Sequence, residues 1–430
     1  MSRPTALDVS RVEPADLRPA QLAWLAAAVF VVSAGYGALL PLLPGWLTSI
    51  MPIASGPEVA RHVGFLSGVY AAGVLIGAPL WGIVSDRTGR SQILIVGFIG
   101  YVASLLLLLV PAFSGLWGLY ALRGMTGFFV AAVVPVVSAL VAENTPDQHR
   151  ARRFAWLGAV SLLGFLFGPA LNVVADVVAR WTGEGLISSA RAVIVLSALS
   201  GAVMMVGLNR TLPAPGTVAA RAPARTDAGP AAPSGARLVS MWWVSGTVMF
   251  VLAGFELGIV LQGQQQAVLS ARQAAMMLAE CSLVMLAINA ILFFTGLLEK
   301  VPSRTLLAAG IILAVAGLAV LTIHRSAVWM YLGVSLTAAG TGLILPVVAY
   351  LAAGASFNKL GATMGGLAAA AGFGQTLGSA FGGWLFGSFA QGGFGWLGIS
   401  LVVLLGFLWA RRDWCADFPR RTPQQPRSAC

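Results

Sequence analysis

The sequence predicts an all-α integral membrane protein with twelve transmembrane helices arranged as two six-helix halves. Three observations predict this class. Of the 430 residues, 58% are hydrophobic and only 10% are Asp, Glu, Lys or Arg, whereas a soluble domain carries about 25% charged residues. The mean hydropathy is +0.86. Twelve apolar runs, each close to the length of about 20 residues that crosses a bilayer, account for most of the chain.

The apolar runs fall into two groups of six on either side of a polar break. The first group lies at 22–44, 63–84, 92–112, 115–142, 154–178 and 191–208, and the second at 241–262, 276–298, 305–323, 328–352, 361–388 and 395–411. The break at 209–240 is rich in Pro, Ala, Gly and Arg, a composition that cannot form a packed core. We therefore predict a first half at 22–208, a flexible cytoplasmic linker at 209–240, and a second half at 241–411.

Basic residues orient the chain in the membrane. With the N-terminus inside, 20 of the 26 Lys and Arg residues fall in inner segments, five fall in outer segments, and Arg123 lies within a span. This bias places the tails at 1–21 and 412–430 in the cytoplasm, so the protein is expected in the cell membrane with both termini inside. The net charge of +11 then reflects membrane topology, and we expect a lipid bilayer and no nucleic acid as partner.

The two halves contain similar segments. Residues 135–142 read PVVSALVA and residues 346–353 read PVVAYLAA, and each segment is followed by two glycines four residues apart. Six-helix repeats in the same orientation, joined by a linker, are typical of secondary transporters. The alternative is a chance similarity between apolar helices.

A charged motif separates the second and third spans. It comprises Gly82, Asp86, Arg87, Gly89 and Arg90. A carboxylate and two guanidinium groups at the inner boundary can form charge-assisted bonds to a neighbouring helix end, and the glycines permit a tight turn. The pattern resembles the G-x-x-x-D-R-x-G-R motif of the major facilitator superfamily, at the same place in the chain. The resemblance implies that superfamily's twelve-helix fold and a gating role for the motif.

Two further motifs strengthen this resemblance. Arg123 begins a sequence that resembles the R-x-x-x-G element in the fourth helix of the superfamily. Gly164, Gly168 and Pro169 resemble the G-x-x-x-G-P core found in the fifth helix of its drug:proton antiporters. This second motif is incomplete, because Ala155 stands at the position of its leading glycine and Asn172 begins the replacement of its closing Gly-Gly.

Arg123 and Glu256 are charged residues deep within predicted spans. Both lie about 10 Å from the outer ends of their spans at 1.5 Å per residue. A charged side chain inside a membrane is costly and is expected to face a partner or a cavity. We expect Glu256 to gain and lose a coupling proton, with Arg123 tuning its proton affinity or contacting substrate. The alternatives are an ion pair that only closes an outer gate, and an arginine that reaches outward along its helix.

Other polar or soft side chains within the spans are weaker indicators of a site. The expected cavity-lining residues are Tyr36, Asn172, Gln262, Asn289 and Gln375, although amides also form ordinary bonds between membrane helices. The acidic Glu280 is expected near the outer surface. A third group shares four-residue spacing and suits Cu(I) ligation, but such a row is also ordinary packing: Met277, Cys281 and Met285.

The leading functional prediction is proton-coupled efflux of small amphiphilic or drug-like molecules by alternating access. Uptake or facilitated diffusion of a metabolite, Cu(I) transport and a non-transporting sensor are the alternatives. The sequence contains no Walker A motif, so ATP-driven transport is not expected. It also contains no catalytic signature such as HExxH or GxSxG, so no enzyme activity is expected. We also expect no cofactor and no bound metal, with a monomer as the functional unit.

Overall fold

The chain folds into long helices. The computed structural model describes residues 17–113, 115–145, 147–181, 186–212, 235–265, 271–295, 297–355 and 360–410, and this part of the chain contains no strand. Eleven of its segments are long and apolar enough to cross a membrane, and the last of them, Gly365–Ala410, contains two helices joined by a turn. Each of the twelve predicted spans therefore has a counterpart. The centre of the predicted linker, most of the N-terminal tail and all of the C-terminal tail lie outside the described residues.

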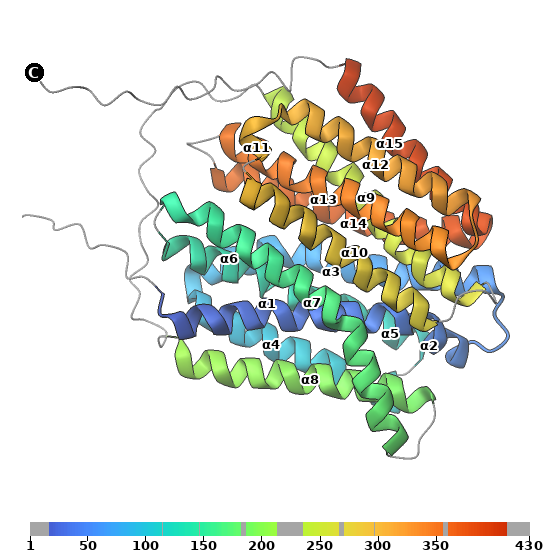
Figure 1. The fold of residues 1–430 in the computed structure, drawn as a ribbon. Coiled ribbons are helices and arrows are strands. Elements are labelled where there is room, and N and C mark those ends of the chain that lie inside the picture. Colours follow the sequence, from blue (N-terminus) through green and yellow to red (C-terminus); the bar gives the residue numbers. More distant parts are fainter. Residues whose placement is uncertain are drawn as a thin grey trace, which may run out of the picture.

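The helices follow the chain in two groups. The first group comprises α1 (Pro19–Leu39), η1 (Leu40–Leu42), α2 (Leu43–Ile50), α3 (Gly56–Thr88), α4 (Arg90–Leu107), η2 (Pro111–Phe113), α5 (Leu116–Val130), α6 (Val134–Glu143), α7 (Asp147–Trp181) and α8 (Leu186–Thr211). The second comprises α9 (Gly235–Gln265), α10 (Ala271–Thr295), α11 (Leu297–Lys300), α12 (Ser303–Ile323), α13 (Ala327–Ala355), α14 (Leu360–Phe389), η3 (Ala390–Gly392) and α15 (Gly393–Ala410). In Figure 1 the blue-to-green helices occupy the lower part of the view and the yellow-to-red helices the upper part.

The predicted span at 115–142 corresponds to one membrane-crossing segment, Leu116–Val141, but this segment consists of two helices, because α5 and α6 are separated at residues 131–133. There the N–H groups of Ala132 and Val133 bond to carbonyls three residues back, to Phe129 and Val130. Pro135 follows at the start of α6 and has no N–H to continue the ladder. In the matching segment of the second half, Pro346 lies inside the unbroken α13. The two similar sequences therefore adopt different local structures.

The segment between the predicted spans 63–84 and 92–112 contains less loop than these bounds imply. Helix α3 continues to Thr88 and α4 begins at Arg90, so Gly89 alone separates them. Its φ of +104° lies in the region that side-chain-bearing residues rarely adopt, which explains why this tight turn needs glycine.

Glycines spaced four apart bring two pairs of helices into backbone contact. Helix α7 packs on α1 and helix α14 packs on α9 in this way. The glycines of α7 and α14 that face the partner backbones are Gly164, Gly168, Gly374 and Gly378. A Cβ atom on any of them would overlap the opposing helix, so small residues are required at these crossings.

Helices α3 and α14 join the two groups, and they diverge along their lengths. At the end where α3 begins, a Cβ atom on Gly64 would lie 2.5 Å from the Cα of Gly383. Nearer the middle, Gly372 of α14 still lies against α3. Beyond that point Gly82 of α3 and Gly365 of α14 have open space where a Cβ would be. The two helices are therefore closed at one end and separated at the other.

Candidate functional site

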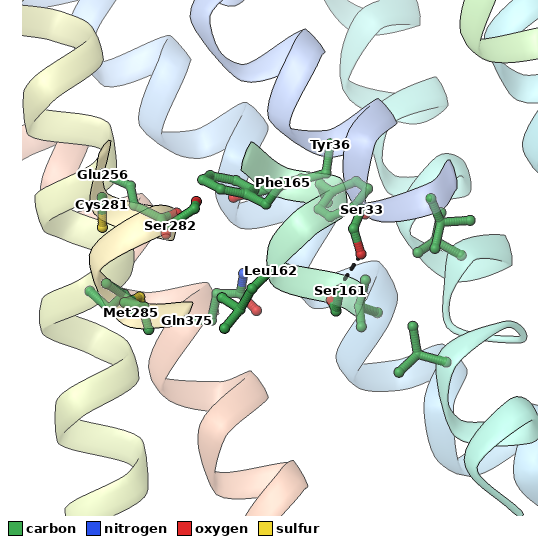
Figure 2. Close-up of a pocket in the computed structure, with 16 residues that line it drawn as sticks. Ser33, Tyr36, Ser161, Leu162, Phe165, Glu256, Cys281, Ser282, Met285 and Gln375 are labelled. Carbon is green, nitrogen blue, oxygen red and sulfur yellow. Dashed lines mark hydrogen bonds between the residues drawn. The ribbon is translucent and has the colours of Figure 1, made fainter. Parts of the chain in front are cut away.

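A cavity of about 290 Å³ lies between the two groups of helices. Helices α1, α3, α5, α6 and α7 line it from the first group, and α9, α10 and α14 from the second. Its volume is near the lower end of the range of about 300–1,000 Å³ found for small-molecule sites. The polar or soft side chains that line it are Ser33, Tyr36, Tyr70, Ser161, Glu256, Cys281, Ser282, Met285 and Gln375. In Figure 2, Ser33, Tyr36 and Phe165 of the first group face Glu256, Cys281 and Ser282 of the second group across the cavity.

Three aromatic rings form one wall of the cavity. Tyr36 of α1 stacks on Tyr70 of α3 with 5.0 Å between ring centroids, and Phe165 of α7 lies 5.8 Å from Tyr36. Beside this wall the hydroxyls of Ser33 and Ser161 share a hydrogen bond of 2.9 Å (Figure 2). The wall thus combines flat apolar surface with hydroxyl groups, as sites for amphiphilic ligands do.

Glu256 lies on the opposite wall, on α9. The structure shows no hydrogen bond or ion pair of this carboxylate within the described part of the chain. Glu256 instead lies within electrostatic reach of the Tyr36 hydroxyl and the Cys281 thiol. A carboxylate in a membrane cavity without a counter-charge is costly when ionised, so its environment favours a bound proton or a cationic ligand.

Arg123 lies behind the aromatic wall, on α5. Its side chain is 1% exposed, and none of its three guanidinium nitrogens has a hydrogen-bond partner among the described residues. The guanidinium carbon lies 4.7 Å from the centroid of the Tyr70 ring. The expected juxtaposition of Arg123 and Glu256 is not present as an ion pair in this conformation, because the aromatic wall stands between the two groups. The guanidinium also does not reach solvent, because it is buried against the Tyr70 ring of α3.

The charged motif after α3 ties three helix ends together. Arg90, at the start of α4, forms ion pairs with Asp86 of α3 and with Glu143 at the end of α6, the latter at 2.7 Å. It also donates a hydrogen bond to the Ser85 hydroxyl. Arg87 is exposed and has no ion pair among the described residues. Among the described residues, these contacts all lie within the first group of helices.

The other predicted site residues divide between the cavity and the helix packing. Tyr36 and Gln375 line the cavity next to each other. Asn172, Gln262 and Asn289 do not line it. Both polar atoms of the Gln262 side chain are buried without a partner, and Asn289 donates to the carbonyl of Met285 on its own helix.

The soft-ligand row on α10 only partly faces the cavity. Cys281 and Met285 line it, whereas Met277 is fully buried elsewhere. Glu280, expected near the outer surface, accepts a hydrogen bond from Ser335 of α13 and keeps its second oxygen buried. Helix α13 therefore covers one side of this half-buried residue, and its place near the outer surface stays a prediction.

Four polar cavity residues were missed by the sequence analysis. Ser33, Tyr70, Ser161 and Ser282 line the cavity, but each sits in an otherwise apolar span among small residues. A tyrosine hydroxyl in the middle of a span was a usable signal for Tyr70, since a buried hydroxyl needs a polar partner or a cavity. The serines carried no such signal.

A twelve-helix membrane bundle with a central cavity between two groups of helices defines the class of secondary transporters. The sequence profile described as "Major Facilitator Superfamily" matches residues 25–292. The chain therefore belongs to the major facilitator superfamily.

Curated relatives share a shorter segment with this chain. The class B tetracycline resistance protein of Escherichia coli is 36% identical over 138 residues, which cover 32% of this chain and 33% of that protein. The quinolone resistance protein NorA of Staphylococcus aureus (strain Mu50 / ATCC 700699) is 27% identical over 145 residues, or 34% of this chain and 35% of that protein. The matched segment thus spans about a third of each relative.

A solved structure supports the fold along most of the chain. The crystal structure of the human organic anion transporter MFSD10 (TETRAN) superposes with a TM-score of 0.68 and 18% sequence identity, covering 91% of this chain and 100% of that chain. At this identity the likeness establishes the fold alone.

Proposed function

We propose that this protein exports small amphiphilic or drug-like molecules in exchange for protons, by alternating access of one central cavity. The observation that carries this proposal is the Glu256 carboxylate, which faces the cavity from α9 without a counter-charge. Superfamily membership and the names of the partly aligned relatives, which are drug resistance proteins, support the direction of transport.

Coupling follows from competition for one carboxylate. When Glu256 holds a proton, its charge is neutralised and the cavity loses its attraction for a cationic or polar ligand. When Glu256 releases the proton, ligand binding compensates for the buried charge. The proton and the ligand are therefore coupled through the charge of Glu256, and they need not contact each other.

The divergence of α3 and α14 supports an alternating-access cycle. We propose that both termini are cytoplasmic, as the basic residues indicate, which puts the closed Gly64–Gly383 end outside and the open Gly82 end inside. The described conformation is then inward-facing. We further propose that Asp86 and Arg90 act at this inner end as part of the gate, since their ion-pair network lies where α3, α4 and α6 meet.

We propose two six-helix halves at 22–208 and 241–411, joined by a cytoplasmic linker at 209–240, with a monomer as the functional unit. The equivalent glycine crossings of α7 on α1 and of α14 on α9 support this division, because each half then repeats one helix pair at the cavity. The halves rock against each other in such a cycle.

The test compares two membrane carboxylates in reconstituted vesicles. Glu256→Gln removes the cavity carboxylate, and Glu280→Gln is the matched control on the neighbouring helix, outside the cavity. We expect Glu256→Gln to abolish accumulation of a fluorescent drug-like amphiphile driven by an imposed pH gradient, and Glu280→Gln to retain it. Undiminished pH-driven transport by Glu256→Gln would overturn the coupling role. The same vesicles report direction, so uptake in place of export is detected directly.

Cu(I) transport is the second candidate, because Cys281 and Met285 both face the cavity beside Glu256. Of the three soft ligands in the predicted row, only these two line the cavity. Accumulation of Cu(I) by wild-type vesicles, lost on Cys281→Ser, would favour this function over drug export.

A further inference from the structure

Arg123 is the most unusual charged group in the described part of the chain. It is a guanidinium buried at the level of the cavity with no hydrogen-bond acceptor for any of its nitrogens. Among the described residues, no carboxylate lies within its electrostatic reach. The side chains within that reach are the tyrosines Tyr36, Tyr70 and Tyr101, which are neutral phenols under ordinary conditions.

The position of Arg123 connects it to the cavity. Tyr70 contacts the guanidinium with its ring and also lines the cavity, and Tyr36 stacks on Tyr70 while lining the same wall. Only an aromatic layer therefore separates the positive charge from the cavity. A charge acts more strongly across an aromatic layer of low dielectric constant than it would across the same thickness of water.

The two walls thus differ in electrostatic character. Glu256 makes one side attractive to a proton or a cation, whereas Arg123 makes the aromatic side attractive to an anion. An anionic group at the Tyr36–Tyr70 wall would also accept hydrogen bonds from the tyrosine hydroxyls. Such an anion supplies the counter-charge that the chain itself does not provide to Arg123.

We propose that the Arg123–Tyr70–Tyr36 side of the cavity is a subsite for an acidic group, so that the transported molecules are amphiphiles carrying a carboxylate or an acidic phenol. This inference rests on the proposed transport function for its physiological meaning. The affinity of the subsite for an acidic group can be measured on the purified protein, without any transport. Charge-assisted hydrogen bonds are about twice as strong as neutral ones, which sets the expected preference for acids at about tenfold or more.

The test uses two dyes that differ in one group, rhodamine B with its free carboxylate and the ethyl ester of rhodamine B. Affinities for the purified full-length protein are measured by fluorescence anisotropy. The wild type is expected to bind the acid at least about tenfold more tightly than the ester. Arg123→Gln should reduce this preference by at least about tenfold, and Arg123→Lys should keep part of it. Arg210→Gln, which removes one exposed positive charge from the end of α8, is the charge-matched control and should keep all of it.

Each outcome decides the question. Equal binding of acid and ester by the wild type overturns the proposal, even if Arg123→Gln does not fold. A preference that survives Arg123→Gln, or equal weakening of both dyes, also overturns it. If the acid preference holds but no pH-driven transport of either dye occurs in vesicles, then the proposed function fails while the subsite stands.

Discussion

Substitution of Gly64 by alanine tests whether the α3–α14 contact holds one end of the cavity closed. A Cβ atom at this position would lie 2.5 Å from the Gly383 Cα, 2.7 Å from the Gly383 nitrogen and 2.8 Å from the Ser379 carbonyl oxygen. All three are backbone atoms, so no side chain can rotate away. The helices must move apart by about 1 Å to restore ordinary van der Waals contact.

The magnitude follows from the cost of overpacking. Inserting a methyl group into a close-packed contact costs about 1–3 kcal/mol, and this cost applies only to the conformation in which α3 and α14 touch. The better helix propensity of alanine, worth about 1 kcal/mol, applies to both conformations and cancels. The closed-to-open ratio at this end should therefore fall by about 5- to 150-fold.

The assay measures access to the cavity from the closed end. Ser33→Cys, in a background where Cys281, Cys415 and Cys430 are replaced by serine, is labelled by a membrane-impermeant maleimide added outside intact cells. Gly64→Ala should accelerate labelling by about the factor given above. Gly56→Ala is the matched control, because it makes the same change in the same helix, outside the charged motif, where nothing lies within 4 Å of the new Cβ. Equal labelling rates in the two variants would refute the reasoning.

Three further predictions concern stability, measured by thermal unfolding in detergent. Gly89→Ala should destabilise the protein by about 1–3 kcal/mol, because φ at this turn is +104°, whereas Gly82→Ala should not; equal melting temperatures would contradict this. A double-mutant cycle on Arg90 and Glu143 should give a coupling of about 0.2–1 kcal/mol, since the carboxylate is half exposed; a value near zero would deny the pair any role in stability. Gln391→Ala should cost about 1–3 kcal/mol, because its amide donates 2.6 Å bonds to two carbonyls at the end of α12, and an unchanged melting temperature would show that those carbonyls find other donors.

The helix content was predictable from sequence because the bilayer imposes it. Every backbone polar group in a membrane must be satisfied within its own segment, so a long apolar run allows only a helix. Local interruptions were less predictable. Pro135 and Pro346 stand in nearly identical sequences, yet only the first marks the start of a new helix. The break before Pro135 depends on tertiary packing around residues 131–133, and local sequence does not predict such packing.

The site was predictable in part for a related reason. A membrane-embedded charge is rare enough to stand out, so Glu256 could be singled out from one sequence, and the structure places it in the cavity. The amides could not be sorted in this way, since Gln375 lines the cavity and Gln262 does not, although both occupy apolar helices. Which face of a helix turns inward is decided by the neighbouring helices, and α14 is oriented by its glycine contacts with α9.

The separation of Arg123 from Glu256 bears directly on the proposed cycle. Had the two formed an ion pair, each would have neutralised the other, and breaking a buried pair costs several kcal/mol, about 3–5 when one partner is removed. Such a pair would stabilise one conformation and would exclude both proton and ligand from the charges. The stacked Tyr36 and Tyr70 rings instead separate the charges. Under the proposed mechanism, Glu256 is then free to exchange a proton while Arg123 remains available to an acidic ligand, so two neighbouring charges serve two different partners within one cavity.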